Sequence, residues 1–311
     1  MEKKNEFYKL FTISSNKFIN EELQLEFRNS NILIAGLGSI GNPIAMAAIR
    51  AGAENLTITD PDVVNIENLP RQQYTCQQIG KNKALATKEN ALLINPFATV
   101  NARSIGTTKE NVHEQVKDAR VIIDAIDIRS LGEIWELHTT ALKLRKPVIT
   151  GYDLAGTAAL EIYRYDEEKI QTLHGKLSPE KINEFYNVRK SLVNKEITES
   201  EFMDYIYDAF SGPIKPLHVP VEQLTELLNR KDGDNRTYQL GTTSTALSAL
   251  TIETIFKLLA NEKIKNSIYI DIPSLVRKRN PSILYKSVLL MKALKVINNR
   301  SKKVNKFLSE K

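Results

Sequence analysis

Cysteine is nearly absent from this chain of 311 residues, which contains only Cys76. A single cysteine cannot form a disulfide, a CxxC metal site or a redox pair within the chain, so a disulfide framework and a cysteine-based structural zinc site are excluded. The sequence also lacks the roughly 20 consecutive uncharged apolar residues that a membrane-spanning helix needs, and no apolar run of signal-peptide length follows the first lysines. We therefore expect a cytoplasmic protein with no membrane span.

Acidic residues are scarce near the C-terminal end. Residues 276–311 hold 11 basic residues and one acid, Glu310, whereas the rest of the chain holds 32 basic and 36 acidic residues. The net charge of +6 therefore comes from the tail. Its cations could bind nucleic acid, an anionic membrane surface or an acidic partner, or they could form the solvated face of a terminal helix. No RNA-binding motif favours nucleic acid.

The composition, 42% hydrophobic and 26% charged, is that of a globular chain. In the first half, short apolar runs alternate with longer amphipathic stretches, which is the pattern of βαβ units. Expected strands cover residues 32–35, 56–59, 98–102, 121–125 and 147–150, and expected helices cover residues 41–51, 80–94, 109–116 and 129–144. We expect the α/β class, with a Rossmann-like, doubly wound and mostly parallel sheet that carries helices on both faces.

The second half has a different pattern, which predicts a helical and antiparallel C-terminal extension. Its expected elements are a strand at 158–165, a helical stretch at 178–210, a break at 212–220, helices at 221–229 and 241–259, a turn at 232–233, a strand at 267–272 and a helical tail from 281. Ser178 and Pro179 have the residue types of an N-cap and a first helical position. The hydroxyl residues at 242–245 predict a cap for the apolar helix that begins there.

The sharpest local motif is rich in glycine. Gly36, Gly38 and Gly41 form the sequence GLGSIG, directly after the expected strand 32–35 and at the start of a helix. Glycines let backbone amides approach a phosphate, and the N-terminus of a helix offers partial positive charge. In this setting the motif favours a bound nucleotide over a purely structural turn, but it does not say which nucleotide.

Acidic, amide and basic residues follow the second expected strand. Asp60 ends that strand, at the place where dinucleotide folds hold a ribose. Asn68, Arg71 and Lys83 come next, and this density of donors suits a triphosphate better than NAD, because cations neutralise the β- and γ-phosphates. The motif IDAID at residues 123–127 puts carboxylates at the sheet edge where such folds bind ligands, and a carboxylate there is a natural magnesium ligand.

The motifs GLGSIG, DPDVVNIENLPRQ, IGKNKA and IDAID, in this order, resemble the ThiF/MoeB and ubiquitin-activating superfamily over about residues 20–156. The resemblance implies that Asp60 holds the ribose of ATP, that Asn68, Arg71 and Lys83 hold the triphosphate, and that Asp127 holds Mg2+. It assigns catalysis to Arg71, Lys83 and Asp127, and cofactor binding to Gly36, Gly38, Ser39, Ile40, Gly41, Asp60, Asp62, Asn68, Arg71, Gln72, Lys83, Asp124 and Asp127.

The same resemblance implies an activity. Members of this superfamily activate the C-terminal carboxylate of a small ubiquitin-like or sulfur-carrier protein as an acyl-adenylate, release pyrophosphate, and commonly work as homodimers. Residues 151–156 resemble the small-residue loop of the superfamily that lets a peptide terminus lie close to the backbone. A tight connection between strands explains them equally well.

Three departures from the superfamily narrow this interpretation. The zinc site made of two CxxC pairs is missing, and no cysteine in the second half could form a thioester. We interpret Cys76 as a small buried or half-buried residue, because no histidine lies nearby in the sequence to activate it. The first arginine is Arg28, so Lys9 or Lys17 would have to replace the N-terminal arginine that relatives present to the nucleotide of the partner subunit.

The leading hypothesis is therefore an ATP- and Mg2+-dependent adenylyltransferase that acts on the free C-terminal carboxylate of a small protein or peptide, without a thioester step. One alternative is an enzyme like the tRNA threonylcarbamoyladenosine dehydratases, which the basic tail supports. Another is a non-catalytic nucleotide-binding partner subunit. We expect residues 1–156 to form the nucleotide-binding half, and residues 157–311 to form a half for substrate recognition and dimerisation that includes the basic helical tail 276–311.

Overall fold

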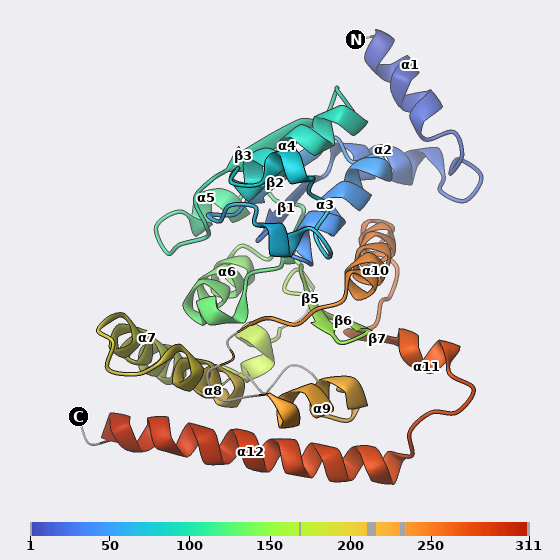
Figure 1. Cartoon of the computed structure of the whole chain (residues 1–311). Coiled ribbons are helices and arrows are strands. Elements are labelled where there is room, and N and C mark those ends of the chain that lie inside the picture. Colours follow the sequence, from blue (N-terminus) through green and yellow to red (C-terminus); the bar gives the residue numbers. More distant parts are fainter. Residues whose placement is uncertain (1, 168, 210–215, 231–233, 235, 310–311) are drawn as a thin grey trace.

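A single mixed sheet runs through the computed structural model, which describes all residues except 1, 168, 210–215, 231–233, 235 and 310–311 (Figure 1). Its seven strands have the order β3-β2-β1-β4-β5-β6-β7. They are β1 (Asn31–Ala35), β2 (Asn55–Thr59), β3 (Thr99–Arg103), β4 (Val121–Asp124), β5 (Val148–Leu154), β6 (Thr157–Tyr163) and β7 (Ser267–Asp271). The strands β1 to β5 pair in parallel, and β6 and β7 add antiparallel pairs. This confirms the expected Rossmann-like, mostly parallel sheet with an antiparallel extension.

Both faces of the sheet are buried, as the continuous apolar runs of its strands predict. Alternate residues of β1 point to opposite faces, so Ile32 and Ile34 enter one core, and Leu33 enters the other. The first core includes residues of α2 (Glu21–Asn29), α3 (Gly41–Arg50), α4 (Lys83–Ile94) and α10 (Gly241–Leu259). The second includes residues of α5 (Val112–Val116), α6 (Leu131–Lys143), α7 (Pro179–Val193) and α8 (Glu199–Ala209). Helices therefore cover both faces, as expected.

The strands of the first half begin within one residue of their expected positions. The helix expected from residue 80 begins only at Lys83, because the side chain of Asn82 accepts the first free amides, those of Ala84 and Leu85. Ser178 caps α7, as predicted. The expected helical stretch 178–210 is divided into α7 and α8, and Lys195 has a left-handed φ of 60° between them. The turn expected at 232–233 and residues 212–215 of the expected break lie outside the described residues.

The remaining helices lie at the periphery. Helix α1 (Glu2–Phe11), which the sequence pattern did not predict, and α12 (Ile283–Ser309) lie at opposite ends of the view in Figure 1. The expected helical tail is α12, which packs on α8 and α9 (Val221–Asn229). Leu289 and Ala293 of α12 form a small apolar cluster with Leu224 of α9. A short helix, α11 (Ile272–Val276), follows β7. Among the described residues, no helix is both long and apolar enough to cross a membrane.

Candidate active site

The glycine loop connects β1 to α3, and its three motif glycines have different surroundings. Gly36 has a φ of +90°, and a Cβ there would lie 2.3 Å from the carbonyl oxygen of Ala125. A Cβ at Gly41 would lie 1.9 Å from the carbonyl oxygen of Gly36. At Gly38 the nearest atom would be Nε2 of Gln72, at 3.9 Å. Gly36 and Gly41 are therefore required by the turn itself, whereas Gly38 leaves open space above the loop.

Asp60 fixes this loop to the end of β2. It is 4% exposed, and its two carboxylate oxygens accept the backbone amides of Leu37 at 2.6 Å and Asp62 at 2.8 Å. Burial raises the pKa of Asp60, although the ammonium of Lys83 acts in the opposite direction. Lys83 is itself buried, and its Nζ lies 3.0 Å from a carboxylate oxygen of Asp62. The structure thus brings Asp60, Asp62 and Lys83 together beside the glycine loop.

Asn68 is the last residue of the 3-10 helix η1 (Ile66–Asn68), and Arg71 and Gln72 follow it. The side-chain oxygen of Asn68 accepts the backbone amide of Asn65 at 2.9 Å, which fixes the residue in a buried position. Gln72 is 6% exposed, and its Oε1 is buried with no hydrogen-bond partner among the described residues. The amide nitrogen of the same side chain faces the open side of Gly38, so Gln72 lies between the glycine loop and the residues that follow η1.

The two carboxylates of the IDAID motif have different environments. Asp124 is 2% exposed and accepts hydrogen bonds from the Oγ1 of Thr150 and the backbone amide of Ile126, both at 3.2 Å. Asp127 is exposed, and its side chain accepts the amide of Arg129, capping the 3-10 helix η3 (Ile128–Ser130). Asp124 therefore orders the loop from within the protein, and Asp127 presents its carboxylate to solvent at the same edge of the sheet.

A single carboxylate such as that of Asp127 is enough for a magnesium ion whose other ligands are phosphate oxygens and water. Among the residues that the structure describes, no group of three or more His, Cys, Asp or Glu side chains could hold a metal. Magnesium in nucleotide sites commonly uses one or two protein carboxylates, with phosphate oxygens and water completing its coordination. The exposed carboxylate of Asp127 beside the glycine loop matches that arrangement. The described residues do not offer a metal site made only of protein ligands.

A buried relay that the sequence motifs did not reveal supports Asp124. His138 of α6 is fully buried, its Nε2 lies 3.1 Å from Asp124 Oδ2, and its Nδ1 lies 3.0 Å from the hydroxyl of Tyr165. The hydroxyl of Tyr165 also accepts the backbone amide of Leu173 at 2.9 Å. The three side chains form one chain of hydrogen bonds, which ties the end of β4 to the second core.

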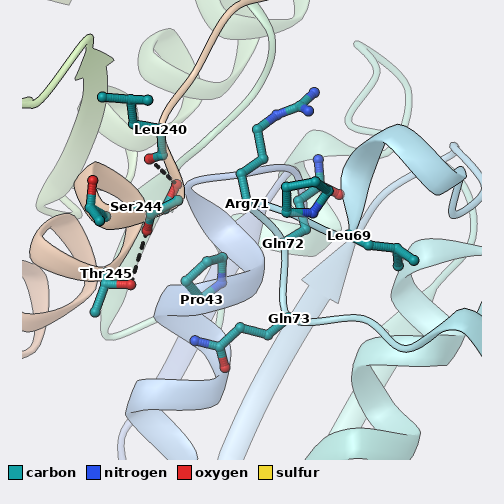
Figure 2. A pocket seen from close by; sticks show the side chains of 11 residues that line it. Pro43, Leu69, Arg71, Gln72, Gln73, Leu240, Ser244 and Thr245 are labelled. Atoms are coloured by element: carbon teal, nitrogen blue, oxygen red, sulfur yellow. Dashed lines mark hydrogen bonds between the residues drawn. The ribbon is translucent and has the colours of Figure 1, made fainter.

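A cleft of about 500 Å³ lies between the residues around Arg71 and the start of α10. Figure 2 shows Arg71 and Gln72 on one side of it and Leu240 and Ser244 on the other, with Pro43 of α3 between them. The segment that ends at Leu240 thus crosses close to the glycine loop, although it is about 200 residues away in sequence. At Gly241 a Cβ would lie 2.5 Å from the carbonyl oxygen of Pro70, so the two segments are in direct backbone contact.

Two further side chains of this region were missed by sequence reasoning. Gln239 accepts hydrogen bonds from Ser39 and Arg71. Asp153 lies near the end of β5, and burial raises its pKa to about 6, against hydrogen bonds from Thr243 and Ser244 that act in the opposite direction. One oxygen of Asp153 is buried with no partner among the described residues. Gln239 belongs to no local motif, and Asp153 lies within residues 151–156, whose resemblance to the small-residue loop gave this carboxylate no role.

Two expectations about individual residues were wrong. Cys76 is exposed rather than buried or half-buried, because it begins a surface 3-10 turn in which Gln78 is the residue that points inward. The hydroxyl residues at the start of α10 do not cap it, since its N-cap is Leu240 with no side-chain hydrogen bond. Thr243 instead accepts the backbone amide of Gly156 at 3.0 Å, so these hydroxyls join α10 to the hairpin of β5 and β6.

Residues 151–154 belong to β5, and Ala155 and Gly156 make the tight connection between strands that was one of the two interpretations of residues 151–156. Ala155 and Gly156 have φ values of 45° and 100°, and they join β5 to β6 in a two-residue hairpin turn. Gly151 packs closely, since a Cβ there would lie 2.9 Å from the side chain of Ile40. The hairpin therefore rests directly on the glycine loop.

The N-terminal lysines and the first arginine differ sharply in environment. The Arg28 guanidinium lies over the ring of Tyr8 at 4.0 Å and binds Glu54 with its Nε at 2.9 Å. Arg28 is thus buried within its own chain, whereas Lys9 and Lys17 are exposed. Arg28 cannot serve as an arginine offered to another molecule.

Relatives found by sequence are named for adenylyl transfer. The sulfur carrier protein adenylyltransferase of Thermus thermophilus is 26% identical over 166 residues, which are 52% of this chain and 57% of that protein. The probable molybdopterin-synthase adenylyltransferase of Porphyra purpurea is 31% identical over 146 residues, which are 45% of this chain and 38% of that protein. The match spans less than two thirds of the length of each of these relatives.

Solved structures of much lower sequence identity share the fold. PaaA has a TM-score of 0.58 at 18% identity, with 91% of this chain and 82% of PaaA covered. MccB of E. coli, in a complex with AMPCPP and MccA, has a TM-score of 0.53 at 16% identity, with 80% of this chain and 66% of MccB covered. The E. coli tRNA N6-threonylcarbamoyladenosine dehydratase has a TM-score of 0.53 at 15% identity, with 82% of this chain and 96% of that enzyme covered.

The family profile extends well beyond the motifs of the first half. It matches residues 13–283, and thus reaches from the segment before α2 to the start of α12. The match includes the glycine loop, the residues around Arg71 and Lys83, the IDAID motif and all of α10. This confirms the resemblance that those motifs carry: the chain belongs to the ThiF family.

Proposed function

We propose that this protein is an ATP- and Mg2+-dependent adenylyltransferase that activates the C-terminal carboxylate of a small protein or peptide as an acyl-adenylate. The observation that carries the proposal is the gathering of the glycine loop, Asp60, Lys83, Arg71 and Asp127 at the carboxyl edge of the sheet. In the sheet, β1 lies between β2 and β4, so the strand order reverses at β1. Open α/β sheets bind ligands at the carboxyl ends of the strands beside such a reversal. Membership of the ThiF family supports ATP as the nucleotide.

The proposed reaction is an in-line displacement. An oxygen of the substrate carboxylate attacks the α-phosphorus of ATP and forms an O–P bond, while the bond from the α-phosphorus to the oxygen that bridges to the β-phosphate breaks, and pyrophosphate leaves. The glycine loop would bind the phosphates through backbone amides, and Asp60 would accept the hydrogen bonds of the ribose. Arg71 and Lys83 would stabilise the negative charge on the departing pyrophosphate. Positioning and charge neutralisation suffice for this chemistry, so no protein nucleophile is needed.

Asp127 would hold the magnesium ion, which supplies further neutralisation of phosphate charge when it is bound. Asp124 would not contact the magnesium ion but would hold the loop that carries Asp127. Its hydrogen bond with the amide of Ile126 and its buried contact with His138 keep the loop before Asp127 in one conformation.

We also propose that residues 1–156 bind the nucleotide, and that residues 157–311 recognise the acyl substrate and contribute to a homodimer. Support for the homodimer comes from exposed apolar side chains on α11 and α12, which a second copy of the chain could cover. They are Leu275, Val276, Leu284 and Met291. Sedimentation or light scattering at micromolar concentration would measure the expected mass of two chains, and a monomer at all concentrations would contradict the dimer.

Pyrophosphate exchange tests the proposed activity. Labelled pyrophosphate should enter ATP only when the protein, Mg2+ and a peptide or small protein with a free C-terminal carboxylate are all present. The same substrate with an amidated C-terminus is the matched control, because it cannot be adenylated at that position. Incorporation that does not depend on a carboxylate substrate would contradict the proposal, and no ATP consumption with any candidate partner would favour a non-catalytic subunit.

A further inference from the structure

Gln239 lies where two donors of the glycine loop region converge. Its side-chain oxygen Oε1 accepts a hydrogen bond from the hydroxyl of Ser39 at 2.8 Å and another from Nε of Arg71 at 3.1 Å. Ser39 is 5% exposed and belongs to the glycine loop itself. A residue from the segment before α10 is thus in contact with two residues that the sequence assigned to the nucleotide.

The Arg71 guanidinium is held from two directions. Nε donates to Gln239, and Nη1 donates to the carbonyl oxygen of Glu67 at 2.6 Å. No hydrogen bond from Nη2 to another described residue is present. An arginine side chain has several rotatable bonds, so two fixed contacts remove much of the conformational entropy that ligand binding would otherwise have to remove.

The backbone that carries Gln239 is anchored independently of Arg71. Gly241 touches the carbonyl oxygen of Pro70, and a Cβ there would approach it to 2.5 Å. Thr243 accepts the backbone amide of Gly156, and Ser244 donates to Asp153 at 3.4 Å. The start of α10 is therefore tied both to the loop that precedes Arg71 and to the β5–β6 hairpin, so Gln239 is a fixed support for Nε of the guanidinium.

We propose that Gln239 is a positioning residue: it holds the guanidinium of Arg71 in the orientation that meets the phosphates of the nucleotide. This inference rests on the proposed function and adds a residue from the second half of the chain to the nucleotide site. A neutral carboxamide suits the role, because it accepts a hydrogen bond from Arg71 without neutralising its charge. A carboxylate at the same place would pair with Arg71 and repel phosphate.

A double-mutant cycle tests the inference. Gln239→Met removes the acceptor at similar size, and Arg71→Ala removes the group that it is proposed to hold. Gln239→Met should weaken ATP binding about fivefold to tenfold, with an unchanged melting temperature, and should have no further effect in the Arg71→Ala background. Gln239→Glu should weaken binding by about 100-fold or more, because it adds a negative charge beside the phosphates. Gln77→Met, at an exposed glutamine of the η2 turn, is the control and should bind ATP as the wild type does.

The outcomes separate this inference from the proposed function. No ATP binding by the wild-type protein would overturn both. Normal binding by the wild type with an unaffected Gln239→Met variant would overturn only the positioning role. The same loss in the presence and absence of Arg71 would also overturn it, since Gln239 would then act without Arg71. Tighter ATP binding by Gln239→Met would likewise overturn the positioning role, because Gln239 would then compete with the nucleotide for Ser39 and Arg71.

Discussion

At the scale of single residues, two glycines of the glycine loop are required by the backbone of the turn, and the third is not. Gly36 and Gly41 have no room for a Cβ, and Gly36 also has a left-handed φ, whereas Gly38 has ordinary space around it. We expect Gly36→Ala and Gly41→Ala to lower the free energy of unfolding by more than about 2 kcal/mol, through backbone clashes. Gly38→Ala should keep the melting temperature and weaken nucleotide binding at least about tenfold, because the methyl group would occupy ligand space.

Thermal unfolding and ATP titration of the three variants would check this distinction. A Gly38→Ala variant that binds ATP normally would contradict the placement of the phosphates above that residue. A stable Gly36→Ala variant would contradict the tight contact with the backbone of Ala125.

Lys83 and Lys81 form a natural pair for testing charge in the site. Lys83 is buried and contacts Asp62 at 3.0 Å, whereas Lys81 forms a surface ion pair with Glu89. Lys83→Ala should lower carboxylate-dependent pyrophosphate exchange by about 10²-fold, because a preorganised cation next to the phosphates is lost. Lys81→Ala should change it little, since exposed ion pairs contribute little. Equal effects of the two substitutions would argue against the assignment of Lys83.

Asp153 predicts a specific dependence of stability on pH. Burial raises its pKa from 3.8 to about 6 in the folded protein, so the folded state binds more protons than the unfolded state between those pH values. The stability that this group contributes is complete below about pH 4 and is lost as pH rises through 6, by about 3 kcal/mol. Asp153→Asn should be more stable than the wild type at pH 7 and about equal to it near pH 4. Denaturant unfolding at both pH values would measure this, and a constant difference would contradict it.

At the scale of elements, the first half could be predicted and much of the second could not. Strands such as β1 and β4 are short apolar runs buried on both faces, and their pattern alone identifies them. The boundary between α7 and α8 depends on one residue, Lys195, with a left-handed φ, for which lysine gives no signal. Helix α1 is amphipathic but mostly exposed, so its single buried residue, Tyr8, leaves little pattern to detect.

The candidate site shows the same division. Motif residues such as Asp60 and Lys83 lie beside β2 and α4 in sequence, so the order of the elements already brings them near the glycine loop. Gln239, Asp153 and His138 reach the site through long-range packing of α10, of the β5–β6 hairpin and of α6. Such contacts depend on how helices cover the sheet, and no local spacing encodes them.

The β5–β6 hairpin offers a stabilising substitution. Ala155 occupies the first turn position with a φ of 45°, a conformation that costs alanine about 1–2 kcal/mol and that asparagine tolerates better. Ala155→Asn would create the Asn-Gly turn that two-residue hairpins prefer, and we expect a gain of about 0.5–1 kcal/mol in unfolding free energy. Gly156→Ala, at a φ of +100° and against Pro273, should destabilise the protein instead. Calorimetry of both variants would show the opposite signs, and a loss of stability in Ala155→Asn would contradict the turn geometry.

At the scale of the whole molecule, charge and site are separated. The candidate active site lies at the carboxyl edge of the sheet, whereas the net charge of +10 in residues 276–311 lies mostly on the peripheral α12 and the segment before it. The buried face of α12 packs on α8 and α9, and exposed cations such as Lys292 and Lys295 lie on its other faces. The cations of the tail therefore lie apart from the candidate active site.

Salt dependence distinguishes the roles open to this basic helix. A polyanion such as tRNA releases counterions when it binds, so its affinity falls steeply as the salt concentration rises, with a slope that reflects the number of phosphates contacted. Two copies of α12 brought together would repel each other, and salt would strengthen that contact. We expect weak, salt-sensitive tRNA binding that the double variant Lys292→Glu, Lys295→Glu abolishes, while its carboxylate-dependent pyrophosphate exchange stays at the wild-type level. Filter binding at several salt concentrations would measure this. Weak tRNA binding that does not change with salt or with the charge reversal would argue against a tRNA-directed enzyme, because the basic tail is the feature that supports that alternative.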